Sequence, residues 1–168
     1  MARIGLVAGG GKLPLMFAKV AKDKGDTVIV FALTGVTDPD IGKCVEKVHW
    51  LTWGSMQKAL FLLATERIKK IVMLGKINKE VVLKGDGDLD GDAKKTMEKI
   101  GDKKDYAILG AVTNVLSKFG IEVIDSTLYL KDLMPKKGLL TKRPPSDKEL
   151  ADIEYGRSVA SHLSGFDI

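Results

Sequence analysis

GLVAGGGKLP, residues 5–14, carries an apolar run into three consecutive glycines and then into a segment of helical periodicity. An apolar run bounded by glycine is typical of a buried strand, and glycine permits a tight turn from a strand into a helix. We therefore predict a strand at residues 3–8 and a helix at residues 13–24. The helical spacing is expected to bury Leu13, Phe17, Val20 and Ala21.

The alternation of apolar runs and helical segments continues along the chain. Further strands are predicted at residues 27–33, 45–51, 71–75 and 121–124. Further helices are predicted at residues 55–69, 93–100, 105–119 and 147–163. Ser146, with Glu149 three residues later, predicts a capping box at the start of the last helix. Strands alternating with long helices indicate βαβ units, so we expect a three-layer, Rossmann-like α/β fold with a parallel sheet, in one domain over residues 1–168.

Composition narrows the class of protein. A chain of 168 residues with 45% hydrophobic and 29% charged residues is typical of an ordinary globular protein. The net charge of +5 favours anionic ligands, but aromatic residues make up only 6% and the lysines are spread out, so no nucleic-acid partner is expected. The single cysteine, Cys44, excludes an internal disulfide and fits a cytoplasmic location.

The glycine loop has two interpretations. In a parallel sheet, the loop after the first strand lies at the carboxyl edge, where ligands collect. Glycines there let the backbone approach an anion, the start of the next helix offers free N–H groups, and Lys12 adds a positive charge. The alternative is a tight turn from strand to helix that holds no ligand.

Two common nucleotide-binding motifs do not fit this loop. A P-loop needs Ser or Thr after its lysine, and the residue here is Leu13. A dinucleotide fingerprint places Gly9 and Gly11 correctly but meets Pro14 where the third glycine belongs, and no acid ends the second strand. We therefore expect neither Walker-type ATP hydrolysis nor NAD binding.

Polar residues follow two later strands. Gly75 and Lys76 come after the fourth strand, where Lys76 is equally compatible with a phosphate contact and with a surface turn. Asp105 opens a predicted helix, while Asp125 ends the fifth strand just before Thr127, and either aspartate fits an N-cap. The sequence offers no Ser-His-Asp or Cys-His arrangement, so no complete catalytic set is visible.

The stretch GDGDLDGD, ending at Asp92, resembles the first half of a calcium-binding loop, with Asp86, Asp88 and Asp90 at the expected offsets. The position of the bidentate glutamate is occupied by Met97. We expect a solvated acidic loop here.

Four motifs together resemble one family. They are IGLVAGGGKLP, LGKI, KDYAILGAVTNVLSKFGIEVIDSTLYLKDLMPKKGLLT and DIEYGRSVASHLSGFDI, in family order and spacing. They resemble the amino-terminal half of the LpxI-type UDP-2,3-diacylglucosamine pyrophosphatases. The resemblance implies a hydrolase of lipid A biosynthesis that converts UDP-2,3-diacylglucosamine to lipid X and UMP with a divalent metal, usually magnesium. It also implies a lipid nucleotide as partner, and it is compatible with peripheral contact with the inner membrane and with a homodimer.

The chain departs from the family pattern at two places. Asp105 is followed by Tyr106, where family members usually carry a second aspartate. Family members also continue into a second domain with the catalytic acid and the metal chemistry, so we expect this chain alone to have little or no pyrophosphatase activity. A non-catalytic nucleotide- or anion-binding module is the alternative.

The resemblance assigns substrate-binding roles, but no catalytic or metal-binding ones, to residues of this chain. The residues are Gly9, Gly10, Gly11, Lys12, Leu13, Gly75, Lys76, Asp105 and Thr127. The first five would form the edge that holds the nucleotide diphosphate, and Gly75 and Lys76 a second wall.

Overall fold

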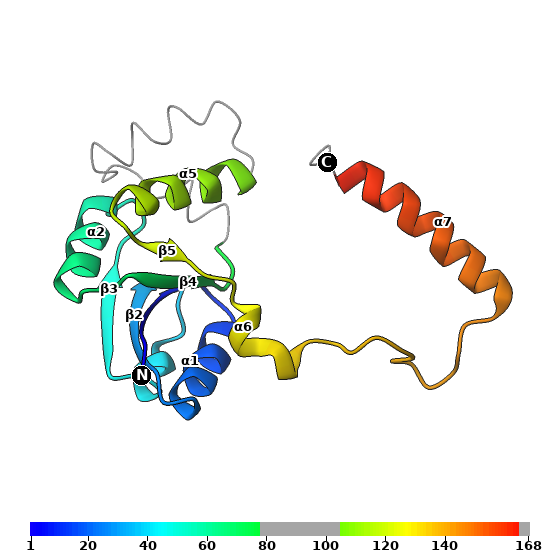
Figure 1. Ribbon diagram of the computed structural model, residues 1–168, viewed down its shortest axis with the longest axis horizontal. Coiled ribbons are helices and arrows are strands. Elements are labelled where there is room, and N and C mark those ends of the chain that lie inside the picture. The colour runs from blue at the N-terminus through cyan, green and yellow to red at the C-terminus, as the bar shows by residue number, and fades with distance from the viewer. Residues whose placement is uncertain (78–104, 165–168) are drawn as a thin grey trace. The chain divides into compact units, whose positions relative to one another are not determined.

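The central sheet explains most of the architecture (Figure 1). The computed structural model describes residues 1–77 and 105–164, and within them five parallel strands form one sheet in the order β3-β2-β1-β4-β5. The strands are β1 (Arg3–Ala8), β2 (Thr27–Leu33), β3 (Lys47–Leu51), β4 (Lys70–Leu74) and β5 (Glu122–Val123). This order is the one expected for a Rossmann-like sheet, and the predicted α/β fold class is confirmed.

Helices cover both faces of the sheet, as Figure 1 shows. One face packs against α1 (Leu13–Asp23), the short 3-10 helix η1 (Pro39–Lys43) and α6 (Thr127–Leu130), which the 3-10 turn η2 (Lys131–Leu133) follows. The other face packs against α2 (Met56–Thr65) and α5 (Asp105–Lys118).

Strand β2 shows why helices cover both faces of the sheet. Its residues Val28, Val30 and Ala32 belong to the core under α1, whereas Ile29 and Phe31 belong to the core under α2 and α5. Successive side chains of a strand point to opposite faces, so an unbroken apolar run must be covered on both sides.

The buried face of α1 differs from the prediction. Pro14, Phe17, Ala18 and Ala21 are buried, while the side chain of Leu13 is 48% exposed. Proline is well suited to the first turn of a helix because it needs no hydrogen-bond acceptor there, and here it packs inward. The small Ala18 and Ala21 then face the sheet, so Phe17 and Ala21 are buried as predicted, while Pro14 and Ala18 are buried in addition.

Element ends differ from the prediction by a few residues where the backbone takes a left-handed conformation. Arg67 has φ of 54° and follows the end of α2, which stops at Thr65 rather than at residue 69. Gly75 has φ of 104° and ends β4 one residue early. The predicted helix at residues 93–100 lies outside the described residues.

The chain divides into two units, Met1–Leu133 and Met134–Ile168. In the second unit, α7 (Asp147–Leu163) has the predicted bounds. Ser146 N donates to Glu149 Oε2 at 2.7 Å and Glu149 N donates to Ser146 Oγ at 3.4 Å, which confirms the capping box. Arg143 binds the same carboxylate, and this pairing comes first among the contacts that lower the pKa of Glu149 to about 2.

Candidate functional site

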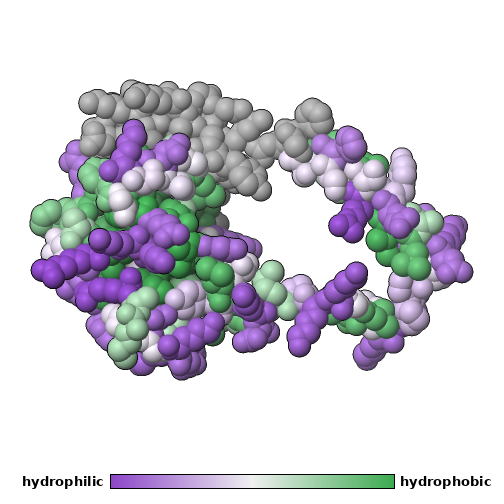
Figure 2. Space-filling model, in the orientation of Figure 1, coloured by the Kyte–Doolittle hydropathy of each residue, from purple (hydrophilic) through white to green (hydrophobic). Residues whose placement is uncertain are grey.

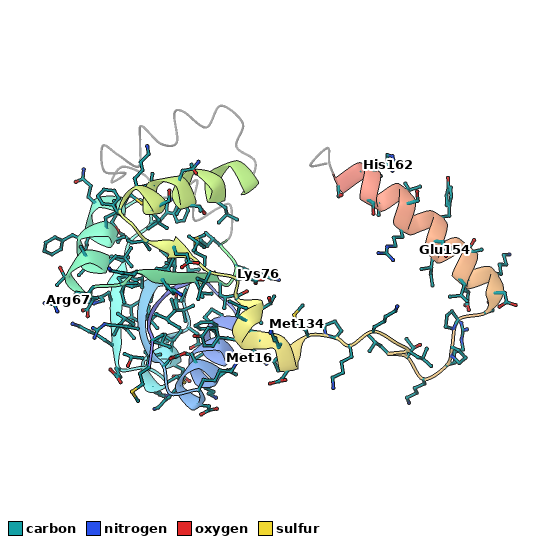
Figure 3. All side chains as sticks on the ribbon, viewed as in Figure 1. Met16, Arg67, Lys76, Met134, Glu154 and His162 are labelled. Atoms are coloured by element: carbon teal, nitrogen blue, oxygen red, sulfur yellow. The ribbon has the colours of Figure 1, made fainter. Side chains whose placement is uncertain are left out.

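The candidate site lies at the carboxyl edge of the sheet, where the loops after β1, β2, β4 and β5 come together. Figure 3 shows Lys76 at this edge and Arg67 at the opposite edge. In a sheet of this topology, ligands bind outside the carboxyl ends of the strands. The first unit therefore has one edge suited to a ligand and one suited to structural contacts.

Hydrogen bonds join two backbone segments at the carboxyl edge, residues 9–10 and 74–76, and we call this pairing the clasp. Gly10 N donates to Lys76 O at 2.8 Å, and Lys76 N donates to Gly10 O at 2.9 Å. Gly9 N donates to Leu74 O at 2.7 Å. A side chain has no room here, because a Cβ on Gly75 would lie 2.7 Å from the carbonyl carbon of Gly9. Tight packing therefore accounts for Gly9, Gly10 and Gly75, and the amides of Gly9 and Gly10 are already bonded within the protein.

The next three residues are arranged differently. Gly11 has φ of 95°, and a Cβ built on it would meet nothing within 4 Å. In the described part of the chain, no acceptor takes the amide N–H of Gly11, Lys12 or Leu13. All three residues are exposed, and the first turn of α1 contains no acidic side chain. Together with the positive end of the helix, these amides could bind an anion through the backbone.

Two lysines flank these amides. The side chains of Lys12 and Lys76 are exposed, and neither forms an ion pair with any described residue. The hydrogen bonds between Gly10 and Lys76 bring the two loops together, so the lysines enter one edge of the sheet from different strands. The predicted site residues from Gly9 to Leu13 thus lie beside Gly75 and Lys76.

The remaining predicted site residues lie farther along the sheet. β5 ends at Val123, so Asp125 lies two residues past the strand rather than at its end, and β4 separates this strand from β1. Asp125 Oδ1 accepts the N–H of Thr127 at 2.8 Å, and this hydrogen bond lowers the pKa of the Asp125 carboxyl. Both the amide and the side chain of Thr127 therefore hydrogen-bond the carboxylate of Asp125 within the protein. Asp105 begins α5, as predicted.

Thr37, which the sequence analysis did not single out, locks the ends of β1 and β2 together. It is buried, its Oγ1 accepts the N–H of Leu33 at 2.9 Å, and its hydroxyl donates to Ala8 O. Threonine in a loop gives no sequence signal for this contact, because both partners are backbone groups brought near by folding.

Glu66 carries the most deeply buried charge among the described residues of the first unit, and no sequence pattern pointed to it. Glu66 is 6% exposed at the amino edge, and its carboxylate contacts Arg3 at 2.6 Å, Lys47 at 2.6 Å and His49 at 2.8 Å. The hydrogen bond from Lys47, followed by those from His49 and Arg3, lowers the pKa of Glu66 to about 2. His49 also stacks on Phe31, consistent with a structural role.

A metal ion needs several His, Cys, Asp or Glu side chains close together. Among residues 1–77 and 105–164, no group of three His, Cys, Asp or Glu side chains is placed to hold a metal ion. The acidic loop from Asp86 to Asp92 lies outside the described residues. The same described residues contain no helix long and apolar enough to cross a bilayer.

The family follows from a match to the first unit. A family model described as the LpxI N-terminal domain matches residues 3–133, which is most of the chain. The chain belongs to the LpxI N-terminal domain family. The match ends at the boundary between the two units, so it covers the sheet, its helices and the carboxyl-edge loops, and leaves α7 outside.

A curated relative supports membership of the LpxI family. UDP-2,3-diacylglucosamine pyrophosphatase LpxI from Caulobacter vibrioides is 24% identical over 169 residues. The alignment covers 100% of this chain and 60% of the relative, so the chain spans less than two thirds of that protein. Among solved structures, N5-carboxyaminoimidazole synthetase from Staphylococcus aureus is 25% identical over 48% of this chain and 21% of that chain, with a TM-score of 0.37. That likeness is too low to support a functional argument.

Proposed function

We propose that this chain is the nucleotide-diphosphate-binding domain of a UDP-2,3-diacylglucosamine pyrophosphatase of lipid A biosynthesis. The proposal is supported by the match to the LpxI N-terminal domain and by the name of the relative from Caulobacter vibrioides. The reaction it would serve is hydrolysis of UDP-2,3-diacylglucosamine to lipid X and UMP.

One observation carries the proposal: three consecutive exposed amides beside two lysines without ion-pair partners in the described residues. A diphosphate has many acceptor oxygens and at least two negative charges, so it needs donors and positive charge together. The amides of Gly11, Lys12 and Leu13 would donate hydrogen bonds to its oxygens. Lys12 and Lys76 would offset its charge.

The chemical step is hydrolysis at the α-phosphorus. Water adds its oxygen to that phosphorus, the bond to the bridging oxygen breaks, and that oxygen leaves with lipid X. The described residues provide no complete metal ligand set, so we assign no step to magnesium and no catalytic residue to this chain. We expect binding without substantial turnover by the chain alone, which spans 60% of its relative.

Titration with UMP and UDP, followed by amide NMR shifts and calorimetry, tests this proposal. We expect the largest shifts at Gly11, Lys12 and Leu13, and tighter binding of UDP than of UMP because UDP carries the second phosphate. Lys12→Ala should weaken UDP binding by about fivefold to tenfold, since one charge-assisted contact contributes about 1–1.5 kcal/mol.

Lys19→Ala is the matched control, because Lys19 is an exposed lysine on the same helix away from the loop. Its UDP affinity should equal that of the wild type. Equal loss in both variants would reduce the effect to overall charge, and unshifted amides at residues 11–13 would overturn the proposed site. An assay with UDP-2,3-diacylglucosamine and magnesium should give little product, and substantial turnover would contradict the assignment as a binding domain alone.

A further inference from the structure

The carboxyl edge exposes apolar side chains as well as lysines. Leu13 is 48% exposed, Met16 36% and Ile77 39%, although each belongs to a segment that enters or leaves the buried sheet. Leu13 and Met16 are on the first turn of α1, and Ile77 follows Lys76, which is bonded to Gly10. Figure 3 shows Met16 and Lys76 toward the same end of the sheet. We call Leu13, Met16 and Ile77 the edge apolar residues.

Positive charge accompanies these apolar groups. Lys12 precedes Leu13, Lys76 precedes Ile77, and both lysines lack ion-pair partners among the described residues. The carboxylate of Asp125, two residues after β5, already accepts a hydrogen bond from Thr127. On the face drawn in Figure 2, apolar patches lie among hydrophilic side chains rather than apart from them. Apolar side chains that are interleaved with lysines suit the interface of an anionic bilayer. The apolar groups enter toward the acyl chains, while the ammonium groups stay among the phosphates.

We infer that the carboxyl edge is the surface by which this domain contacts an anionic lipid bilayer. The choice of a lipid surface rests on the proposed function, whose substrate carries two acyl chains. In this arrangement, Met16 and Ile77 enter the headgroup region, while Lys12 and Lys76 meet lipid phosphates. The amides of residues 11–13 then lie at the depth of the substrate's diphosphate, so the lipid nucleotide need not leave the bilayer to be bound.

A second exposed apolar pair lies toward the other end of the sheet. Phe61, in the middle of α2, is 70% exposed, and Phe119, just after α5, is 64% exposed. Both helices run back from the carboxyl edge, and their last turns share a core through Leu63 and Leu116. This pair is more exposed than Met16 and Ile77, so it provides a strict control for exposure alone.

The amino edge is less suited to an anionic surface because several of its cations are already paired. Arg3 and Lys47 bind the carboxylate of Glu66, and Lys70 lies 3.8 Å from Glu122. Each of these cations already has a carboxylate of the protein beside it, although Arg3 and Lys47 share one. The lysines of the carboxyl edge remain available for lipid phosphates.

Co-sedimentation of the whole chain with phosphatidylglycerol vesicles and with phosphatidylcholine vesicles tests the inference. We expect salt-sensitive binding to phosphatidylglycerol and little binding to phosphatidylcholine. The Met16→Ser/Ile77→Ser variant should lose at least about tenfold in binding, because burying two apolar side chains contributes more than 1.4 kcal/mol. The Phe61→Ser/Phe119→Ser variant should bind as the wild type does. Lys12→Ala/Lys76→Ala should lose about tenfold or more, at about 1 kcal/mol for each lysine.

Each other outcome overturns the inference. Absence of binding to either vesicle rejects a bilayer contact, and loss of binding in the phenylalanine variant places the contact at the opposite edge. Sedimentation equilibrium without lipid should give the same mass for the wild type and for Met16→Ser/Ile77→Ser, because a lower mass in the variant would make this surface an interface between two copies. UDP affinity of the same variant should stay unchanged, so failure of the lipid contact is distinguishable from failure of the proposed nucleotide site.

Discussion

At the amino edge of the sheet, the buried carboxylate of Glu66 binds Arg3, Lys47 and His49, whereas at the carboxyl edge Lys12 and Lys76 have no ion-pair partner among the described residues. Both edges belong to the same five strands, and both place basic residues at or near the ends of strands. The difference is that folding places a carboxylate against basic residues at one edge, whereas no described acidic side chain pairs with the two lysines at the other.

Backbone amides within the carboxyl edge show the same contrast between groups that are bonded within the protein and groups that are not. Gly9 and Gly10 use their amides to join the end of β1 to Leu74 and Lys76, while the amides from Gly11 to Leu13 have no acceptor among the described residues. The clasp therefore lies directly beside three amides whose N–H groups no described residue accepts. Preorganised donors bind an anion better than mobile ones, because little ordering of the loop remains to be done on binding.

The largest expected effect comes from breaking the clasp with Gly75→Ala. A Cβ there would lie 2.7–2.8 Å from backbone atoms of Gly9 and Gly10, in a backbone with φ of 104°. Overpacking against rigid backbone and a left-handed conformation each carry a penalty, so the free energy of unfolding should fall by about 3 kcal/mol or more. Urea denaturation measures this loss.

Gly11→Ala is the matched control for that variant. Its φ of 95° is equally unfavourable for alanine, but the new Cβ would meet nothing within 4 Å. The loss should therefore be about 1–2 kcal/mol, from backbone strain alone. Equal losses in the two variants would show that the close approach of Gly9 and Gly75 contributes nothing to stability.

Glu66→Gln should have the next largest effect. The amide keeps the shape of the carboxylate but leaves Arg3, Lys47 and His49 without its charge. A hydrogen bond to a charged group contributes about 1.5–3 kcal/mol to stability. Because the partners of Glu66 are partly exposed, we expect the free energy of unfolding to fall by an amount in the lower part of that range. Glu122→Gln, which removes the exposed pair with Lys70, should cost less than about 0.5 kcal/mol.

The pH dependence of unfolding gives this prediction a second measurement. The pKa of Glu66 is lowered from 4.5 to about 2 in the folded protein, so unfolding raises it and takes up a proton. The stabilisation is complete above pH 4.5 and disappears as the pH falls toward 2. The difference in unfolding free energy between wild type and Glu66→Gln should shrink over that range, and a constant difference would contradict the lowered pKa.

The smallest expected changes in unfolding free energy come from replacing one lysine at each edge. Lys47→Met removes a contact of 2.6 Å to Glu66 at the amino edge and should reduce the unfolding free energy by about 1 kcal/mol. Lys76→Met, at the carboxyl edge, should change it by less than about 0.5 kcal/mol because Lys76 has no ion-pair partner among the described residues. Thermal or urea unfolding under the same buffer conditions measures both. The reverse order would show that the charges of the two edges do not differ in their structural roles.

Local patterns determined much of the fold. The apolar runs gave the bounds of β1 and β2 residue for residue, and Ser146 with Glu149 gave the start of α7. These features depend on periodicity and on hydrogen bonds between near neighbours, both of which can be read along the chain. The parallel sheet followed from the alternation of strands and helices, and the family resemblance followed from motif order.

Contacts between distant segments required the tertiary structure. Glu66 meets Arg3 across 63 positions, and Thr37 meets Ala8 across 29, so neither pairing leaves a local pattern. The glycine loop could be located from the sequence, but only the tertiary structure showed that the amides of Gly9 and Gly10 bond the segment at Leu74–Lys76, whereas no described residue accepts those of residues 11–13. The sequence determined where the five strands and the long described helices lie, to within a few residues at their ends. The folded arrangement decided which polar groups are satisfied internally, because satisfaction depends on neighbours in space.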